Sequence, residues 1–261
     1  MADMHLDVAK DLAKQAGEII KKNFTLNCNQ EWKDNNTPVT ATDLAVNSLV
    51  LKTLKEAFPG HSILSEEGDD FSETSEHVWV CDPVDGTHNF SHGIPTATFA
   101  LALTESGMPV LTVVYDPFLD RMFWAEKGKG AFMNGKKIRV TESATLQRTV
   151  VGMGKLKEVR NLHPLLEAIK AHGGTSIVGL SIHYMSALVA AGEFSASLFG
   201  GRSVYDMTPS KLLVEEAGGK DTDLFGKTPE RFDRDQEGQL CSSQTLHAEI
   251  MTILNKVSPV K

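Results

Sequence analysis

The chain has 261 residues, of which 41% are hydrophobic and 23% are charged, and these proportions suit one large globular domain or two small ones. No stretch approaches the roughly 20 consecutive apolar residues of a membrane span, and the acidic, amphipathic start differs from the basic and then apolar start of a secretory signal. From these two features we expect a cytoplasmic protein that does not bind membranes. The formal net charge of −8 opposes binding to a polyanion, so we do not expect nucleic acid as a partner.

The first half of the chain predicts two amphipathic helices followed by short strands. Apolar residues recur at steps of three and four over residues 4–24 and again over residues 46–58. Thr42-Asp43 indicates the start of the second helix, and Pro59-Gly60 ends it. Five strands are then predicted, at residues 61–64, 78–81, 97–103, 110–115 and 121–125. The dipeptide Asn134-Gly135 predicts a two-residue hairpin turn.

Beyond residue 142 predicted strands and helices alternate, which is typical of an α/β layer. The strands cover residues 149–153 and 176–180, and the helices cover residues 162–171 and 182–191. Thr208 is predicted to cap a further helix that has Pro209 in its first turn and ends at Gly218-Gly219. We therefore predict an α+β half, residues 1–142, packed on an α/β half, residues 143–261, with any cleft between them.

Acidic residues gather at the ends of two predicted strands of the first half. Glu66 and Glu67 follow the strand HSIL, and Asp82 and Asp85 lie in WVCDPVDGTHNF. Taken singly, Asp-Pro and Asp-Gly are ordinary turn formers, and adjacent glutamates usually belong to a solvated loop. Here, however, a nearly continuous apolar strand leads straight into Asp82, and a buried carboxylate needs a cation or several hydrogen-bond donors.

The segment DPVDGT can seat a metal ion and a phosphate together. Proline fixes the backbone after Asp82, so that a turn can bring Asp85 beside it with the Val84 carbonyl facing the same space. Carboxylate and carbonyl oxygens are the ligands that Mg²⁺ prefers. Gly86 lets a phosphate approach the backbone closely, and a short helix starting at Thr87 would point its free N–H groups at the anion.

Five segments of the sequence together resemble the inositol monophosphatase family of metal-dependent, lithium-sensitive phosphatases. They are TPVTATD (37–43), SEE (65–67), DPVDGTHNF (82–90), KGKGAFMNGKKIRV (127–140) and YDMTPSKLLVEEAGG (205–219). The resemblance is close over residues 33–141 and looser over residues 177–219. It implies an α+β fold built as a layered αβαβα sandwich, a homodimer, and a Mg²⁺-dependent phosphomonoesterase that hydrolyses a small phosphorylated polyol or sugar by direct in-line attack of metal-activated water.

The resemblance also implies roles for individual residues, with two or three Mg²⁺ ions. Glu66, Asp82 and the Val84 carbonyl would bind the first ion, Asp82, Asp85 and Asp206 the second, and Glu66 with Glu67 a third, weaker one. Thr87 and Asp43 match the pair that orients the attacking water, and Glu66 is predicted to be catalytic together with them. Gly86 and Thr87 would bind the phosphate. Lys33 falls in a mobile loop that covers the site. Two cations about 3.5–4 Å apart can activate a water, neutralise the phosphate and stabilise the departing alkoxide.

Two of these residues have competing interpretations from the sequence alone. Asp206 precedes Pro209 by three residues and can simply help to cap the following helix. Cys81 adjoins Asp82 and resembles a nucleophile, but it has no His–Asp companion, and strand alternation should turn it away from the metals. With Cys28 and Cys241 it lacks the paired spacing of a zinc site or a disulfide framework, and we interpret all three as reduced thiols.

The identity of the substrate depends on the segment SLFGGRSVYD, where inositol-specific members of the family supply an acid for sugar hydroxyls. Arg202 and Ser203 are predicted to contact the substrate instead, and an arginine suits a second anionic group. Alternatively, Arg202 points to solvent or pairs with an acid such as Glu193. Fructose-1,6-bisphosphatase or 3′-phosphonucleotide phosphatase activity therefore stays open beside inositol phosphate hydrolysis, as does a non-catalytic regulatory or binding protein on the same fold.

Overall fold

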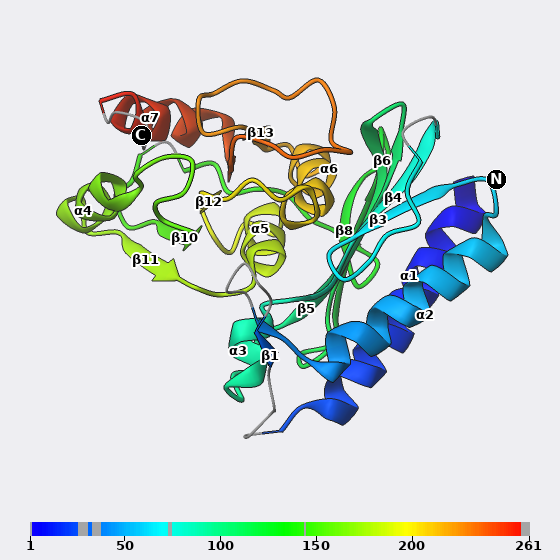
Figure 1. The fold of residues 1–261 in the computed structure, drawn as a ribbon. Coiled ribbons are helices and arrows are strands. Elements are labelled where there is room, and N and C mark those ends of the chain that lie inside the picture. Colours follow the sequence, from blue (N-terminus) through cyan, green and yellow to red (C-terminus); the bar gives the residue numbers. More distant parts are fainter. Residues whose placement is uncertain (1, 26–30, 33–37, 73–74, 144, 257–261) are drawn as a thin grey trace.

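The computed structural model describes residues 2–25, 31–32, 38–72, 75–143 and 145–256 (Figure 1). Its helices are α1 (Ala2–Asn23), α2 (Ala41–Ala57), α3 (Thr87–Ser91), α4 (His163–Ala171), α5 (Ile182–Ala190), the 3-10 helix η1 (Val204–Asp206), α6 (Thr208–Glu216) and α7 (Gln244–Leu254). Its strands are β1 (Glu31–Trp32), β2 (Pro38–Val39), β3 (Ser62–Ser65), β4 (His77–Asp85), β5 (Thr98–Glu105), β6 (Met108–Asp116), β7 (Arg121–Glu126), β8 (Gly130–Met133), β9 (Lys136–Lys137), β10 (Val150–Gly154), β11 (Thr175–Val178), β12 (Ala196–Phe199), β13 (Lys220–Thr222) and β14 (Gln239–Ser242).

The larger sheet has seven strands in the order β3-β4-β5-β6-β7-β8-β9. Strands β3 and β4 are parallel, and the other neighbours are antiparallel. Strands β8 and β9 are joined at Asn134 and Gly135, whose φ angles of 48° and 78° are both positive. This is the geometry that a two-residue primed turn requires, and it confirms the predicted hairpin.

The smaller sheet and the helices complete a five-layer sandwich. The sheet runs β11-β10-β12-β14-β13, with β10 parallel to both of its neighbours. Helices α1 and α2 cover the outer face of the larger sheet, α5 and α6 lie between the two sheets, and α4 and α7 cover the outer face of the smaller one (Figure 1). An apolar core fills each of the main interfaces, so the predicted αβαβα arrangement is confirmed.

The helix starts differ from the predicted ones in detail. The cap of α2 is Thr40 rather than Thr42, and it forms a capping box with Asp43, because a threonine just before the helix can accept the N–H groups of the first turn. Thr208 does not cap α6: it is the first helical residue, and its hydroxyl donates to the Phe232 carbonyl at 2.7 Å.

Helix α5 is the most enclosed element of the middle layer. All nine of its residues are buried, since one side packs on the larger sheet and α6 while the other packs on the smaller sheet. Within the described part of the chain, no helix combines the length and apolar character needed to cross a membrane.

Candidate metal centre

Strand β4 separates an apolar face from the face that carries the acids. Trp79 and Cys81 belong to the core beneath α1 and α2, whereas Val78 and Val80 pack against Val204 on the opposite face. Alternation along a strand therefore turns Cys81 away from the side on which η1 lies, as predicted. Burial raises the pKa of the Cys81 thiol well above its usual value, so this cysteine stays protonated and is a poor nucleophile.

The segment from Asp82 to Asp85 is an irregular continuation of β4 rather than the predicted turn after it. The pairing of β4 with β5 shifts register between Asp82 and Asp85, and such an irregularity re-aims side chains within a strand. The backbone N–H of Val84 donates to Asp82 Oδ1 at 3.2 Å. Carboxylate oxygens of Asp82 and Asp85 and a ring nitrogen of His183 all lie within 4.8 Å of one another.

The first turn of α5 holds the Asp85 carboxylate. The Ser181 hydroxyl, which caps α5, donates to Asp85 Oδ2 at 2.5 Å, and the backbone N–H groups of His183 and Ile182 donate to Asp85 at 2.7 and 3.2 Å. Free N–H groups at a helix start favour a negative charge. The sequence argument missed Ser181 and His183, although a serine before an apolar helical run is itself a cap signal.

His183 is excluded as a metal ligand by its own hydrogen bonds. Its Nε2 lies 2.8 Å from the Tyr205 carbonyl, and its Nδ1 lies 2.8 Å from Ser210 Oγ. Burial chiefly lowers the pKa of His183, so the ring is neutral and has one N–H, which must be on Nε2 because a carbonyl only accepts. Nδ1 then accepts from the Ser210 hydroxyl, and both ring nitrogens are engaged.

Further acids approach from β3 and η1. Ser65 pairs with Cys81 in the parallel register, and the Glu66 N–H donates to the Cys81 carbonyl at 3.3 Å, which puts Glu66 next to Asp82 along the sheet. Burial, and then the charges of Glu66, Asp85 and Asp206, raise the pKa of Asp82 well above its usual value. Acids that repel one another in this way are stabilised by a bound cation.

Asp206, at the end of η1, is the acid that the second half of the chain contributes. Burial chiefly raises the pKa of Asp206 to about 8; Lys155 acts in the opposite direction, and Glu66 adds to the rise. Lys155 Nζ lies 3.8 Å from Asp206 Oδ2. Lys155 carried no motif in the sequence, and its position next to the acids emerges only from the packing of β10 beside β12.

The predicted water-orienting pair is in hydrogen-bond contact. Thr87 Oγ1 lies 2.9 Å from Asp43 Oδ1 and 2.9 Å from the Val84 carbonyl. The other Asp43 oxygen accepts the Thr40 N–H at 2.9 Å and the Thr40 hydroxyl at 2.5 Å. Burial raises the pKa of Asp43, while the hydrogen bonds from Thr40 and Thr87 lower it. The capping box of α2 thus fixes the carboxylate that holds Thr87.

The remaining predicted residues lie at the edge of the centre or beyond it. Gly86 precedes α3 with φ of 93° and lies against Ser181, where an added Cβ would come within 3.3 Å of the serine Cβ. Glu67 follows Glu66 in the loop after β3, and the Ser203 carbonyl accepts the Asp206 N–H. Lys33 lies outside the described residues.

Arg202 lies at the surface. It forms an ion pair with Glu237 in which the two side chains are 49% and 48% exposed. The alternative in which Arg202 pairs with an acid therefore describes this structure, with Glu237 in the place of Glu193, which pairs with Arg121.

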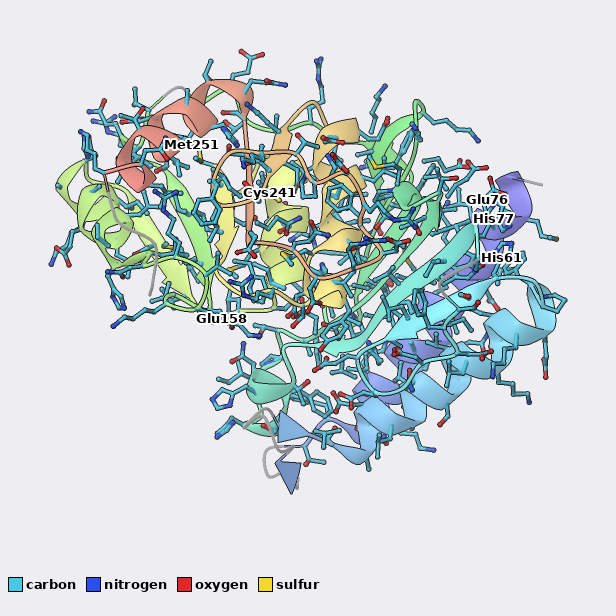
Figure 2. All side chains as sticks on the ribbon, turned by 45° about the horizontal axis from the view of Figure 1, so that its top comes forward. His61, Glu76, His77, Glu158, Cys241 and Met251 are labelled. Atoms are coloured by element: carbon cyan, nitrogen blue, oxygen red, sulfur yellow. The ribbon has the colours of Figure 1, made fainter. Side chains whose placement is uncertain are left out.

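A group of histidines lies at the opposite end of β4 and is separate from this centre. Figure 2 shows His61 and His77 side by side, and their rings stack with centroids 4.7 Å apart. His61 Nδ1 accepts the Trp79 indole N–H at 3.1 Å. Because a strand rises about 3.3 Å per residue, His77 is roughly 25 Å from Asp85.

Comparisons with known proteins agree over nearly the whole chain. A model of the inositol monophosphatase family matches residues 2–258. Inositol monophosphatase 2 of Solanum lycopersicum is 42% identical over 238 residues, which cover 85% of this chain and 88% of the relative. A fructose-1,6-bisphosphatase/inositol-1-monophosphatase of Thermotoga maritima is 30% identical over 258 residues, 97% of this chain and 96% of the relative. The solved structure of a Thermotoga maritima IMPase superposes with a TM-score of 0.87 at 28% identity and covers 98% of both chains.

Proposed function

The chain belongs to the inositol monophosphatase family, and from this premise we propose that it hydrolyses a small phosphorylated polyol or sugar with two or three Mg²⁺ ions as cofactor. Membership makes it a phosphoric monoester hydrolase that depends on metal ions. The observation that carries the proposal is the approach of the Asp82 and Asp85 carboxylates on β4, which lie within 4.8 Å of each other, beside η1 with Asp206, which packs on β4. Burial, and then repulsion among these acids, raise the pKa values of Asp82 and Asp206.

The donor set fits Mg²⁺, because carboxylate and carbonyl oxygens are its preferred ligands. We assign Glu66, Asp82 and the Val84 carbonyl to one ion, Asp82, Asp85 and Asp206 to a second, and Glu66 with Glu67 to a weaker third. When bound, these ions would supply the positive charge that neutralises the phosphate and the developing alkoxide, and would make water a stronger acid.

The chain's own residues would orient the attacking water. The Thr87 hydroxyl has one proton, and donating it to Asp43 or to the Val84 carbonyl leaves an oxygen lone pair free to accept a hydrogen bond from water. Because Cys81 faces the core under α1 and α2, the geometry favours direct in-line attack by water over a covalent phosphocysteine. Gly86 and the start of α3 are the proposed phosphate contacts.

The substrate class is supported by the names of two relatives, an inositol monophosphatase and a fructose-1,6-bisphosphatase/inositol-1-monophosphatase. Inositol phosphate comes first; a sugar bisphosphate, and after it a 3′-phosphonucleotide, are the alternatives. We also propose a cytoplasmic homodimer. The free, buried state of Cys81 and Cys241 is compatible with a reducing compartment, and sedimentation analysis would measure the oligomeric state.

The test compares Asp85→Asn with the matched control Asp11→Asn, which changes an exposed acid on α1. Hydrolysis of inositol 1-phosphate is measured with Mg²⁺ and after chelation. We expect chelation to abolish turnover, Asp85→Asn to lower kcat/KM by about a hundredfold or more because a ligand is lost, and Asp11→Asn to match the wild type. Turnover that survives both chelation and Asp85→Asn would refute the proposal. No turnover on any phosphate ester, together with a stoichiometric protein or RNA partner, would favour the regulatory alternative.

A further inference from the structure

Lys155 is a cationic side chain at the border between the metal centre and solvent. It follows β10 directly, its side chain is 39% exposed, and its Nζ lies 3.8 Å from Asp206 Oδ2. Its other ion-pair contact is Glu158, also at 3.8 Å and 44% exposed, which Figure 2 marks on the second half of the chain. Both contacts are longer than a charged hydrogen bond of about 2.7–2.9 Å, so they leave the three N–H donors of the ammonium able to bind another anion.

The surroundings of Lys155 are built to hold its side chain in this place. The ammonium lies 5.2 Å from the centroid of the Phe199 ring, a cation–π contact. A Cβ on Gly201 would come within 2.7 Å of Lys155 Cδ, and one on Gly200 within 1.9 Å of the Lys155 carbonyl oxygen. The two glycines at the exit of β12 therefore make room for both the backbone and the stem of the lysine.

The backbone of Lys155 is also held in a conformation that a lysine rarely adopts. Its φ is 43°, in the left-handed region, where a non-glycine residue is strained and persists only when its surroundings enforce it. A glycine at this position would avoid the strain, and Gly154 immediately precedes it. This position therefore holds a charged side chain, although glycine, which has no side chain, would adopt the same backbone conformation without strain.

We propose that Lys155, resting on Phe199, binds a second phosphate group, so that among the sugar esters accepted beside inositol phosphate a bisphosphate is preferred to the corresponding monoester. The inference rests on the proposed phosphatase function and names its substrate class. The reacting phosphate belongs to the ions and to Gly86 and Thr87 on the first half, whereas Lys155 approaches from the second half. The role predicted for Arg202 thereby passes to Lys155, because Arg202 donates a direct hydrogen bond to Glu237, whereas both ion-pair contacts of Lys155 are longer than a hydrogen bond.

The experiment compares two substrates that share the reacting phosphate, fructose 1,6-bisphosphate and fructose 1-phosphate. The measured quantity is the ratio of their kcat/KM values in the wild type, in Lys155→Met, which keeps the length and removes the charge, and in Lys155→Arg. Lys157→Met, an exposed lysine two residues along the same loop, is the matched control. We expect the ratio to fall about tenfold or more in Lys155→Met, the scale of a lost charged hydrogen bond, to recover partly in Lys155→Arg, and to stay constant in Lys157→Met.

An equal loss for both substrates in Lys155→Met would overturn the proposal, because Lys155 would then serve the reacting phosphate or Asp206. A ratio that falls in Arg202→Ala and not in Lys155→Met would overturn it as well. Mg²⁺-dependent turnover of inositol 1-phosphate but of neither fructose ester would overturn the proposal and leave the proposed function standing. No Mg²⁺-dependent turnover of any of the three esters would instead refute the proposed function. A second measurement uses binding instead of turnover: calorimetry gives the dissociation constants of the two fructose esters with Ca²⁺, another oxygen-ligated ion, in place of Mg²⁺. If the ratio of these constants is the same in the wild type and in Lys155→Met, the role of Lys155 is again overturned.

Discussion

His183 connects two of the acidic residues, Asp85 through its backbone and the neighbour of Asp206 through its buried ring, and removal of the ring should weaken both folding and metal binding. Its backbone N–H holds Asp85, and its ring bonds the carbonyl of Tyr205, the residue before Asp206, and the Ser210 hydroxyl of α6. The backbone bond survives substitution, whereas both ring bonds are lost in His183→Ala.

The expected magnitudes follow from these contacts. His183→Ala leaves a carbonyl and a hydroxyl buried without their partner, and each such group costs about 1–3 kcal/mol. The two groups alone account for about 2–6 kcal/mol and the cavity adds to this, so the free energy of unfolding should fall by at least about 2 kcal/mol. Because residues that orient metal ligands typically affect affinity 10- to 100-fold, we expect the half-saturating Mg²⁺ concentration to rise about tenfold.

The assay combines urea denaturation with Mg²⁺ titration of activity. His247→Ala is the matched control: this histidine is also buried, at 3% exposure, and it bonds the Thr222 hydroxyl at 2.9 Å on the far side of the smaller sheet. It should lose stability without a change in Mg²⁺ requirement. In His183→Gln, an amide that can donate to the Tyr205 carbonyl should partly restore the Mg²⁺ affinity. If His183→Ala shifts the Mg²⁺ requirement no more than His247→Ala does, the positioning role is wrong.

Two further predictions concern the ions. Lithium should inhibit turnover by competing for the site of Asp82, Asp85 and Asp206, because a small hard cation suits these oxygens; an inhibitor titration at fixed Mg²⁺ that shows no effect would contradict this assignment. The metal-free protein should lose stability as pH rises. Burial raises the pKa of Asp206 from 3.8 to about 8, so the folded state keeps a proton that the unfolded chain has released, and the free energy of unfolding falls between these two values. Chelated protein should therefore melt at a lower temperature at pH 8.5 than at pH 6, with a smaller difference when Mg²⁺ is present; equal differences would refute the argument.

The parts of the centre that the sequence predicts are those that a short segment carries. Asp82, Val84 and Asp85 share one segment of six residues with Gly86 and Thr87, and an apolar run before them indicated burial. The layers of the sandwich followed from the alternation of elements and from the family resemblance. The division at residue 142 stays a prediction, as do the individual ligand assignments.

The parts that the sequence did not predict depend on contacts across the fold. Ser181 meets Asp85 over a separation of 96 residues, and no local pattern encodes that meeting. The sequence did contain a signal for His183, because a histidine inside the apolar run of α5 needs buried hydrogen-bond partners. The sequence does not identify those partners. The proline of DPVDGT suggested a turn, and the neighbouring strand β5 instead held the segment in an irregular ladder.

Because α5 is buried on every side, its residues tolerate substitution far less than the residues of the exposed loops do. A substitution in this helix disturbs one of the two sheets or the hold on Asp85, so the groups that perform hydrolysis are confined to a few side chains. The loops after β10 and β12 carry Lys155, which lies next to Asp206, and Arg202, which pairs with Glu237 at the surface. A change in either of these exposed side chains alters the charge and shape of the surface. Proteins with this fold can therefore change from one phosphate ester to another by substitutions in such exposed loops, while the residues that perform hydrolysis stay the same.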